Sequence, residues 1–135
     1  MASHSEFKAH VEASGIHAHL DISIREAAKD KVVLELPVGS TVHQPFGLLH
    51  GGVSALLAES AASFGAALNA EGKNVVGVEI SASHLRSMTE GTLVATATPI
   101  RVGRSIQVWH IDLSDQDGRQ IADAKCTVSV LDPKG

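Results

Sequence analysis

Two adjacent glycines near the middle of the chain could stabilise developing negative charge. Gly51 and Gly52 follow His50 at the expected start of a long helix, where the first backbone N–H groups have no helical partner and the helix dipole adds partial positive charge. Glycine has no Cβ to block an approaching carbonyl oxygen. Amide groups that are fixed before reaction stabilise an oxyanion at little reorganisation cost. The simpler alternative is a plain turn that enters a helix.

A single carboxylate follows along that helix. Glu59 is the only charged residue between Val53 and Ala70, and a carboxylate in apolar surroundings loses hydration unless it meets a partner or a cleft. Ser63 could hydrogen-bond this carboxylate or a water beside it. Alternatively, Glu59 faces solvent and the Ser63 hydroxyl bonds the carbonyl four residues earlier. At about 100° per residue, the face that carries Glu59 is expected to hold the small residues Gly52, Ala55, Ala62, Ser63 and Ala66.

The remaining polar candidates are a glutamine and several histidines. Gln44, in the loop before the helix, could donate its side-chain amide to a carbonyl oxygen or hold a water, although a solvent-facing glutamine fits equally well. His17, His19, His43 and His50 raise the question of a metal. The sequence has no HExxH motif, no cysteine cluster and no carboxylate at ligand spacing, so no metal site is expected.

Apolar periodicity predicts the elements that must position these residues. A short surface helix that Gly15 ends is expected near the start, and the long alanine-rich stretch predicts one buried helix because it has no polar face. Helices are expected at residues 5–14 and 53–70, and strands at residues 16–24, 31–38, 74–85, 92–101, 105–113 and 120–131. The first two strands are expected to form a hairpin and the last four to pair consecutively. The antiparallel sheet would then wrap around the long helix.

Composition and charge limit the class of protein. A chain of 135 residues is expected to form one domain, residues 1–135. Hydrophobic residues make up 44% and charged residues 19%, with a formal net charge of −4, which excludes a disordered chain and argues against nucleic-acid binding. Aromatic residues, at 3%, are too few to stack bases.

The cellular setting is predicted from two further features. Cys126 is the only cysteine, and no charged start with an apolar stretch resembles a secretory leader, so a cytoplasmic location is expected. The long helix would span about 30 Å at 1.5 Å per residue. A central glutamate and several serines nevertheless argue against a membrane span.

The spacing of the two chemical groups implies an assembly. Gly51 and Glu59 are separated by about 12 Å along one helix axis, so one chain cannot easily present both to one carbon atom. A two-fold dimer with antiparallel helices would bring the helix start of one chain beside Glu59 of the other, which gives two equivalent composite sites.

Three segments carry a family resemblance: HQPFGLLHGGVSALLAESAAS, VVGVEISASHLRS and RVGRSIQVWHIDLSDQDGR. They resemble the hotdog-fold acyl-CoA thioesterases, above all the aryl-CoA branch. That branch includes the 1,4-dihydroxy-2-naphthoyl-CoA thioesterases of menaquinone or phylloquinone synthesis, the enterobactin-pathway proofreading thioesterases and one type of 4-hydroxybenzoyl-CoA thioesterase. The likeness covers roughly Val38 to Leu131 and implies an α+β fold with an antiparallel sheet around one long central helix.

The resemblance also implies roles for individual residues. Glu59 would be the catalytic carboxylate, as nucleophile or as general base on water, with the Gly51 N–H as oxyanion donor. Gln44 and His50 would orient the thioester, and Ser63 would support the carboxylate or the water. The residues implied along the substrate and CoA are Gly77, His84, Leu85, Arg86, Ser87, Arg101, Val102, Gly103, Arg104, Ser105 and Ile106; the arginines among them suit phosphates.

One residue departs from the family pattern, because Phe64 stands where related enzymes often carry a smaller or more flexible apolar side chain. It either alters the acyl pocket or packs in the core. The familiar members are tetramers of paired dimers, so a homodimer or homotetramer is expected.

The function expected from these observations is hydrolysis of an aromatic acyl-CoA thioester, without metal or cofactor. Alternatives are a proofreading thioesterase that acts on an acyl carrier protein, a non-catalytic acyl-CoA binding protein, and a dehydratase of the same superfamily. The dehydratase needs a histidine and an acidic residue on the helix, where this chain has Glu59 and, just before the helix, His50. Release of a free thiol from benzoyl-CoA would separate hydrolysis from the last two.

Overall fold

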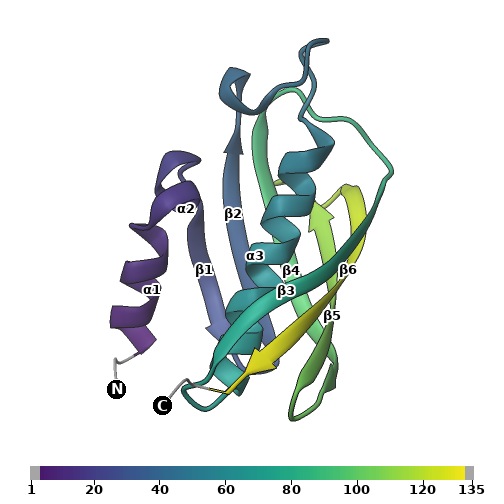
Figure 1. The fold of residues 1–135 in the computed structure, drawn as a ribbon. Helices are drawn as coiled ribbons and strands as arrows, with labels where there is room; N and C mark the ends of the chain where they lie inside the picture. The colour runs from purple at the N-terminus through teal and green to yellow at the C-terminus, as the bar shows by residue number, and fades with distance from the viewer. Residues whose placement is uncertain (1–3, 133–135) are drawn as a thin grey trace.

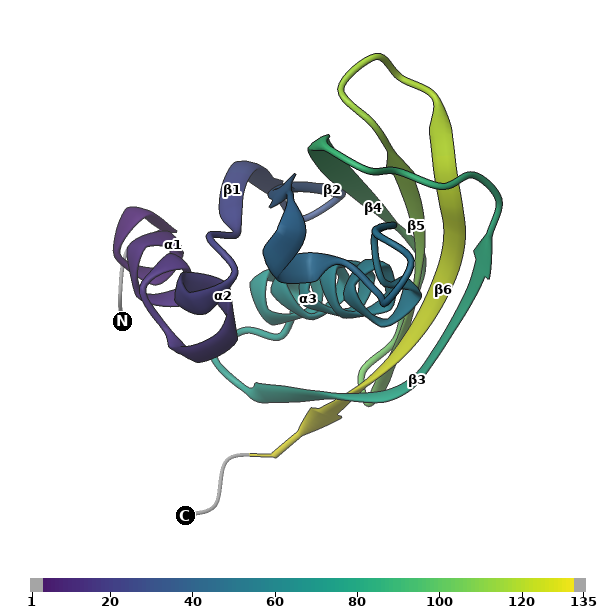
Figure 2. The same cartoon turned by 90° about the horizontal axis from the view of Figure 1, so that it is seen from above.

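The computed structural model describes residues 4–132 and confirms the expected α+β architecture. All six strands join one antiparallel sheet in the order β1-β2-β4-β5-β6-β3 (Figure 1). The strands are β1 Ser23–Ala28, β2 Lys31–Val38, β3 Asn74–His84, β4 Gly91–Val102, β5 Ile106–Ser114 and β6 Gln120–Leu131. The sheet curls around one long helix, which is clearest in the view from above (Figure 2).

The central helix, α3 Gly51–Asn69, is the expected long helix. The side that faces the sheet is made of small and apolar residues, so the helix approaches the strands closely. Gly65, for example, lies against the buried Trp109 of β5, whose indole N–H donates to the side-chain oxygen of Gln107 over 2.9 Å. By length and composition α3 could cross a bilayer, but the sheet that surrounds it explains its apolar sequence.

The strand order corrects one expectation. The last four strands do not pair consecutively: β4, β5 and β6 form a meander, whereas β3 lies at the far edge and pairs with β6, from Asn74 opposite Leu131 to His84 opposite Ala122. Most β3 side chains are exposed, including Val76 and Val78. An edge position suits such a strand better than a central one, where both faces would be covered.

The N-terminal segment corrects a second expectation. Its first helix, α1 His4–Glu12, is close to the predicted one, but the predicted strand at residues 16–24 begins as a second helix, α2 Gly15–His19, and only Ser23 starts β1. The alternating sequence also fits a helical turn, because Ile16 and Leu20 are four residues apart, and the Leu20 N–H donates to the Ile16 carbonyl over 2.9 Å. The β1–β2 hairpin itself is confirmed.

Two connections complete the scaffold. The link from β2 to α3 contains a short 3-10 helix, η1 Ser40–Val42. The turn between β5 and β6 is organised by Asp115, whose Oδ1 accepts hydrogen bonds from the backbone N–H groups of Asp117 and Arg119, each at 2.9 Å. The Arg119 guanidinium adds an ion pair to the other oxygen at 2.8 Å. The buried carboxylate thus accepts hydrogen bonds from backbone N–H groups of the turn that have no partner in a neighbouring strand.

Candidate active site

The start of α3 leaves one backbone donor available. His50 is the N-cap, with an extended backbone (φ −69°, ψ 129°), and its Nδ1 accepts from the Gly52 N–H at 2.8 Å. The Gly51 N–H has no acceptor within residues 4–132. This amide therefore keeps the donor and the positive end of the helix dipole that an oxyanion requires.

Gln44 is held so that its amide nitrogen is the free end. Its Oε1 accepts from the backbone N–H groups of Phe46, at 2.6 Å, and Leu48, at 3.3 Å. The oxygen assignment follows from these two donors. The side-chain NH2 makes no hydrogen bond within the described chain, and Gln44 and Gly51 line the same cavity of about 400 Å³.

The segment after β3 lines this cavity too. The cavity is bordered by His84, Leu85, Arg86 and Ser87, four of the residues that the resemblance expects along the substrate. The His84 ring packs directly on Gly51, because a Cβ added to Gly51 would lie 2.8 Å from His84 Nε2. Arg86 is exposed and forms no ion pair with a residue in the range 4–132. We refer to this space, with its amide donors and free arginine, as the donor cavity.

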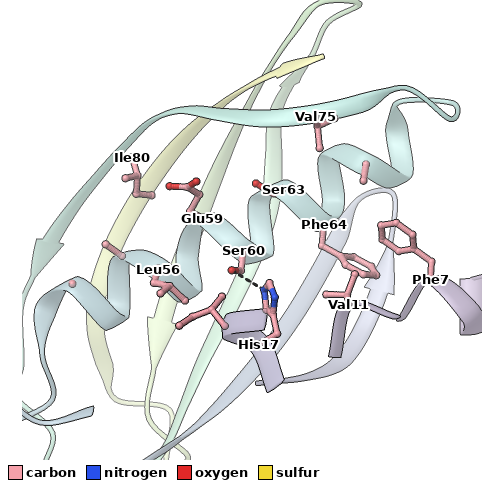
Figure 3. Close-up of a pocket in the computed structure, with 14 residues that line it drawn as sticks. Phe7, Val11, His17, Leu56, Glu59, Ser60, Ser63, Phe64, Val75 and Ile80 are labelled. Carbon is pink, nitrogen blue, oxygen red and sulfur yellow. Dashed lines mark hydrogen bonds between the residues drawn. The ribbon is translucent and has the colours of Figure 1, made fainter. Parts of the chain in front are cut away.

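Glu59 lies in a different and larger cavity of about 670 Å³, between α1, α2, α3 and β3. Its side chain is half-buried and points toward β3 (Figure 3). The carboxylate rests on Gly77, where an added Cβ would lie 2.5 Å from Oε2. Gly77 therefore meets the candidate catalytic carboxylate itself. A β-bulge in β3 begins at this glycine, as often happens beside functional sites. We call this space the acyl cavity.

The other residues around Glu59 differ from the predicted helix face. Ser63 lines the acyl cavity and does not bond the carbonyl four residues earlier; within the described chain its hydroxyl makes no hydrogen bond at all. Ala62 and Ala66, expected on this face, are instead fully buried against the sheet. The face that lines the cavity is therefore centred closer to Ser60, because the sheet covers the side of α3 that carries Ala62 and Ala66.

An aromatic pair closes the far end of the acyl cavity. The rings of Phe64 and Phe7 have centroids 5.0 Å apart and planes tilted by 57°. Phe64 both packs in the core, with 5% of its surface exposed, and lines the cavity. The two interpretations of this residue are therefore compatible.

Sequence reasoning missed the N-terminal wall of this cavity, which includes Phe7, Val11 and His17. His17 Nε2 lies 2.9 Å from the Ser60 hydroxyl oxygen. The position of Ser60, one residue after Glu59, was the only sequence signal, because the contact with His17 spans 43 residues.

A buried thiol lies near the carboxylate. Burial, together with the negative charge of Glu59, raises the pKa of Cys126 to about 11. The thiol is therefore protonated near neutral pH, and Cys126 is unsuited to act as a nucleophile.

The residues implied for CoA do not all meet in one chain. Arg101 to Ile106 form the β4–β5 hairpin at the opposite end of the sheet from the start of α3 (Figure 1). Val102, Gly103 and Arg104 line a small cavity of about 230 Å³ beside the C-terminal end of α3. A single chain thus separates the Arg101–Ile106 segment from Arg86, just as it separates Glu59 from Gly51.

Metal binding has no support in the described residues. Residues 4–132 contain no cluster of three or more His, Cys, Asp or Glu side chains that could hold an ion. His43, one of the candidate ligands, directs its Nε2 to the Thr89 carbonyl oxygen at 2.7 Å.

The chain is similar to known proteins in both sequence and fold. A family model described as "Thioesterase superfamily" matches residues 46–122. The chain is 45% identical over 117 residues to a 1,4-dihydroxy-2-naphthoyl-CoA hydrolase of Listeria monocytogenes, covering 86% of this chain and 95% of that protein. It is 40% identical over 114 residues to the proofreading thioesterase EntH of Cronobacter turicensis, covering 84% and 83%. A crystal structure of a thioesterase from Haemophilus influenzae superposes with a TM-score of 0.89 at 38% identity, covering 98% of this chain and 92% of that one.

Proposed function

The chain belongs to the thioesterase superfamily and is an acyl-CoA thioesterase, and from this we propose that it hydrolyses an aromatic acyl-CoA to the free acid and CoA. The observation that carries the proposal is the half-buried Glu59 carboxylate at the edge of an apolar cavity that an aromatic pair closes. Ring edges and faces attract one another, so Phe7 and Phe64 suit an aromatic acyl group. The naphthoyl and proofreading names of the relatives point the same way.

In the proposed reaction Glu59 acts on the thioester carbonyl in one of two ways. As a nucleophile, its carboxylate forms a bond to the carbonyl carbon and CoA leaves as a thiolate; water then hydrolyses the resulting anhydride. As a general base, it takes a proton from water while the water oxygen attacks the same carbon; the C–S bond then breaks, and the departing CoA thiolate takes up that proton. Both routes place negative charge on the carbonyl oxygen. The Gly51 N–H and the free Gln44 amide would stabilise that charge, without metal or cofactor.

Supporting roles follow for the neighbouring residues. His50, which orders the start of α3 through Gly52, and Gln44 orient the thioester, while Ser63 holds the water or the carboxylate. His84, Leu85 and Ser87 line the path of CoA.

The proposed site is shared by two chains. Each chain presents the donors and the carboxylate in separate cavities, and about 12 Å of helix axis lies between Gly51 and Glu59. No other strand of residues 4–132 pairs with the outer edge of β3, where Val76 is 46% and Val78 62% exposed. We propose that two β3 strands pair across a two-fold axis. That arrangement sets the α3 helices antiparallel, and two such dimers form the expected tetramer.

The same arrangement would complete the CoA site. The start of α3 in one chain would come close to the end of α3 in its partner. The partner's hairpin from Arg101 to Ile106 lies beside that helix end, so it would also come close to the start of α3. Arg101 and Arg104 of one protomer and Arg86 of the other would then be available to the CoA phosphates.

A complementation experiment tests the shared site. Gly51→Pro removes the proposed oxyanion donor, and proline is tolerated at the first helical position because His50 already has the extended backbone that a following proline requires. The new Cβ would lie 2.8 Å from His84 Nε2, so the His84 ring must shift; Gly51→Ala adds the same Cβ, keeps the N–H and is the matched control. Glu59→Ala removes the carboxylate. Each variant alone should lose at least about 100-fold in turnover, measured as thiol release from benzoyl-CoA and 1,4-dihydroxy-2-naphthoyl-CoA.

Mixing the two variants has a defined expected result. Every mixed dimer contains one intact site, and random exchange makes half of the dimers mixed, so activity should return to about a quarter of wild type. Two affinity tags verify that mixed dimers form. Mixed dimers that are no more active than the parent variants would show that the site lies within one chain. Absence of thiol release by the wild-type protein from every aryl thioester would instead refute the aryl substrate.

A second candidate substrate is an aryl thioester of an acyl carrier protein, which the similarity to EntH favours. Comparing kcat/KM for one acyl group on CoA and on a carrier protein separates the two substrates.

A further inference from the structure

One polar pair interrupts the otherwise mainly apolar wall of the acyl cavity away from Glu59. His17, on α2, directs its ring toward Ser60, on α3, with 2.9 Å between Nε2 and the hydroxyl oxygen (Figure 3). The neighbours of this pair include Leu56, Phe64 and Val11. A polar pair on an apolar wall fixes the orientation of a bound ligand more than it adds to affinity.

The pair lies where the acyl group must pass. Glu59 and Phe64 are five residues apart, about 7.5 Å along the helix axis, and the Ser60 side chain lies between them (Figure 3). An aromatic acyl group whose carbonyl carbon meets Glu59 and whose ring approaches Phe64 would therefore present a ring position to Ser60.

The pair can bond a hydroxyl group in either direction. Burial lowers the pKa of His17, so the imidazole is neutral near pH 7 and has one N–H and one acceptor nitrogen. If Nε2 accepts from Ser60, the hydroxyl oxygen can still accept a hydrogen bond. If Nε2 donates, the Ser60 O–H is free to donate. Ser60 does not bond the carbonyl of Leu56, four residues earlier, within the described chain.

The N-terminal helices hold His17 in place. The Glu12 carboxylate accepts from the Ile24 N–H of β1 at 2.7 Å, and the Phe7 ring packs on Phe64. The first contact joins residues on either side of His17 in the chain, and both contacts anchor the segment that carries it to the rest of the molecule.

We propose that His17 and Ser60 together determine specificity by hydrogen-bonding a hydroxyl substituent on the aromatic ring of the acyl group. This inference rests on the proposed function and narrows it: the preferred substrates are hydroxylated aryl thioesters. One relative is named a 1,4-dihydroxy-2-naphthoyl-CoA hydrolase, and the acyl group in that name has hydroxyl substituents on its aromatic ring.

The experiment compares substrates within each variant, so that a general loss of activity cancels. The substrates are benzoyl-CoA and its 2-, 3- and 4-hydroxy derivatives. One neutral hydrogen bond should favour the best hydroxylated isomer over benzoyl-CoA by about 3- to 10-fold in kcat/KM. Ser60→Ala and His17→Leu should bring this ratio to about 1, whereas His17→Gln, which keeps a donor and an acceptor, should retain part of it.

The Ser60→Ala variant is expected to fold, because alanine is favourable in a helix, so a change in its substrate preference can be interpreted. If kcat/KM falls equally for all four substrates in Ser60→Ala and His17→Leu, the pair only anchors α2 and the inference is overturned. A wild-type enzyme without preference for any hydroxylated isomer also overturns it, while the aryl thioesterase activity stands. If only alkyl thioesters are hydrolysed, the proposed aryl function fails first and the inference fails with it.

Discussion

Replacing Gly77 by alanine should impair catalysis while the fold stays intact. The new Cβ would lie 2.5 Å from Glu59 Oε2 and 2.9 Å from Cδ, whereas ordinary contact begins at 3.4 Å. The carboxylate must therefore move by about 0.9 Å. A displacement of about 1 Å in a reacting group costs about 100-fold in rate, which corresponds to about 2.7 kcal/mol in the activation free energy. We expect kcat for aryl-CoA hydrolysis, followed by thiol release, to fall by that factor.

Stability and a matched variant separate this effect from misfolding. Glu59 is half-buried and its end can shift, so the free energy of unfolding should change by less than about 1 kcal/mol. Gly39 provides the control, because a Cβ there meets nothing within 4 Å and its φ of −158° suits any residue. Gly39→Ala should retain wild-type kcat. A Gly77→Ala protein with near-normal kcat would refute the proposed catalytic role of Glu59 in this position.

Three further predictions concern stability and the buried groups. Gly65→Ala would place a Cβ 2.5 Å from Trp109 Cη2, and because both residues are buried, denaturant titration should show a loss of about 1–3 kcal/mol; an unchanged midpoint would contradict the packing. Burial tends to raise the pKa of Asp115. Hydrogen bonds from the backbone and side chain of Arg119, together with the positive charge of the Arg119 guanidinium, outweigh this effect, so the pKa of Asp115 is lowered. Asp115→Asn should therefore be less stable than wild type above the ordinary Asp pKa of about 3.9, and thermal melts of the two should converge as pH falls through the lower folded-state value. Burial raises the pKa of Cys126 to about 11, so the folded protein should react with a thiol reagent at pH 8 far more slowly than the protein in denaturant; equal rates would place the thiol at the surface.

Strong local patterns were sufficient for much of the fold. The strands β2 and β6 have the bounds that the sequence predicted, and α3 differs by two residues at its start and one at its end, because long apolar patterns leave little choice of element. The position of β3 could not be predicted in this way. Its partner β6 is chosen by tertiary packing, and nothing in the sequence of β3 itself records that choice.

The candidate site divides in a similar way. Gly51 and Gln44 were recognisable because a helix start and its preceding loop are local features, and the structure brings both to the donor cavity. His17 was considered only as a metal ligand, because its sequence alternates like a strand and its place in the cavity wall depends on a contact with Ser60 across 43 residues. Periodicity identifies which element a residue belongs to, but it does not identify which distant element lies opposite.

The edge position of β3 also affects how the chain is made. As the protein leaves the ribosome, β3 emerges before its neighbour, because β4 and β5 lie between Asn74 and its partner Leu131. Until the final strand has been synthesised, α3 has no lid on the side of Glu59, and the nascent chain exposes Val76 and Val78 on a strand without a partner. Such delayed, long-range pairing slows folding and favours aggregation. The strand that lies against Glu59, the proposed catalytic carboxylate, is thus among the last parts of the molecule to reach its folded position.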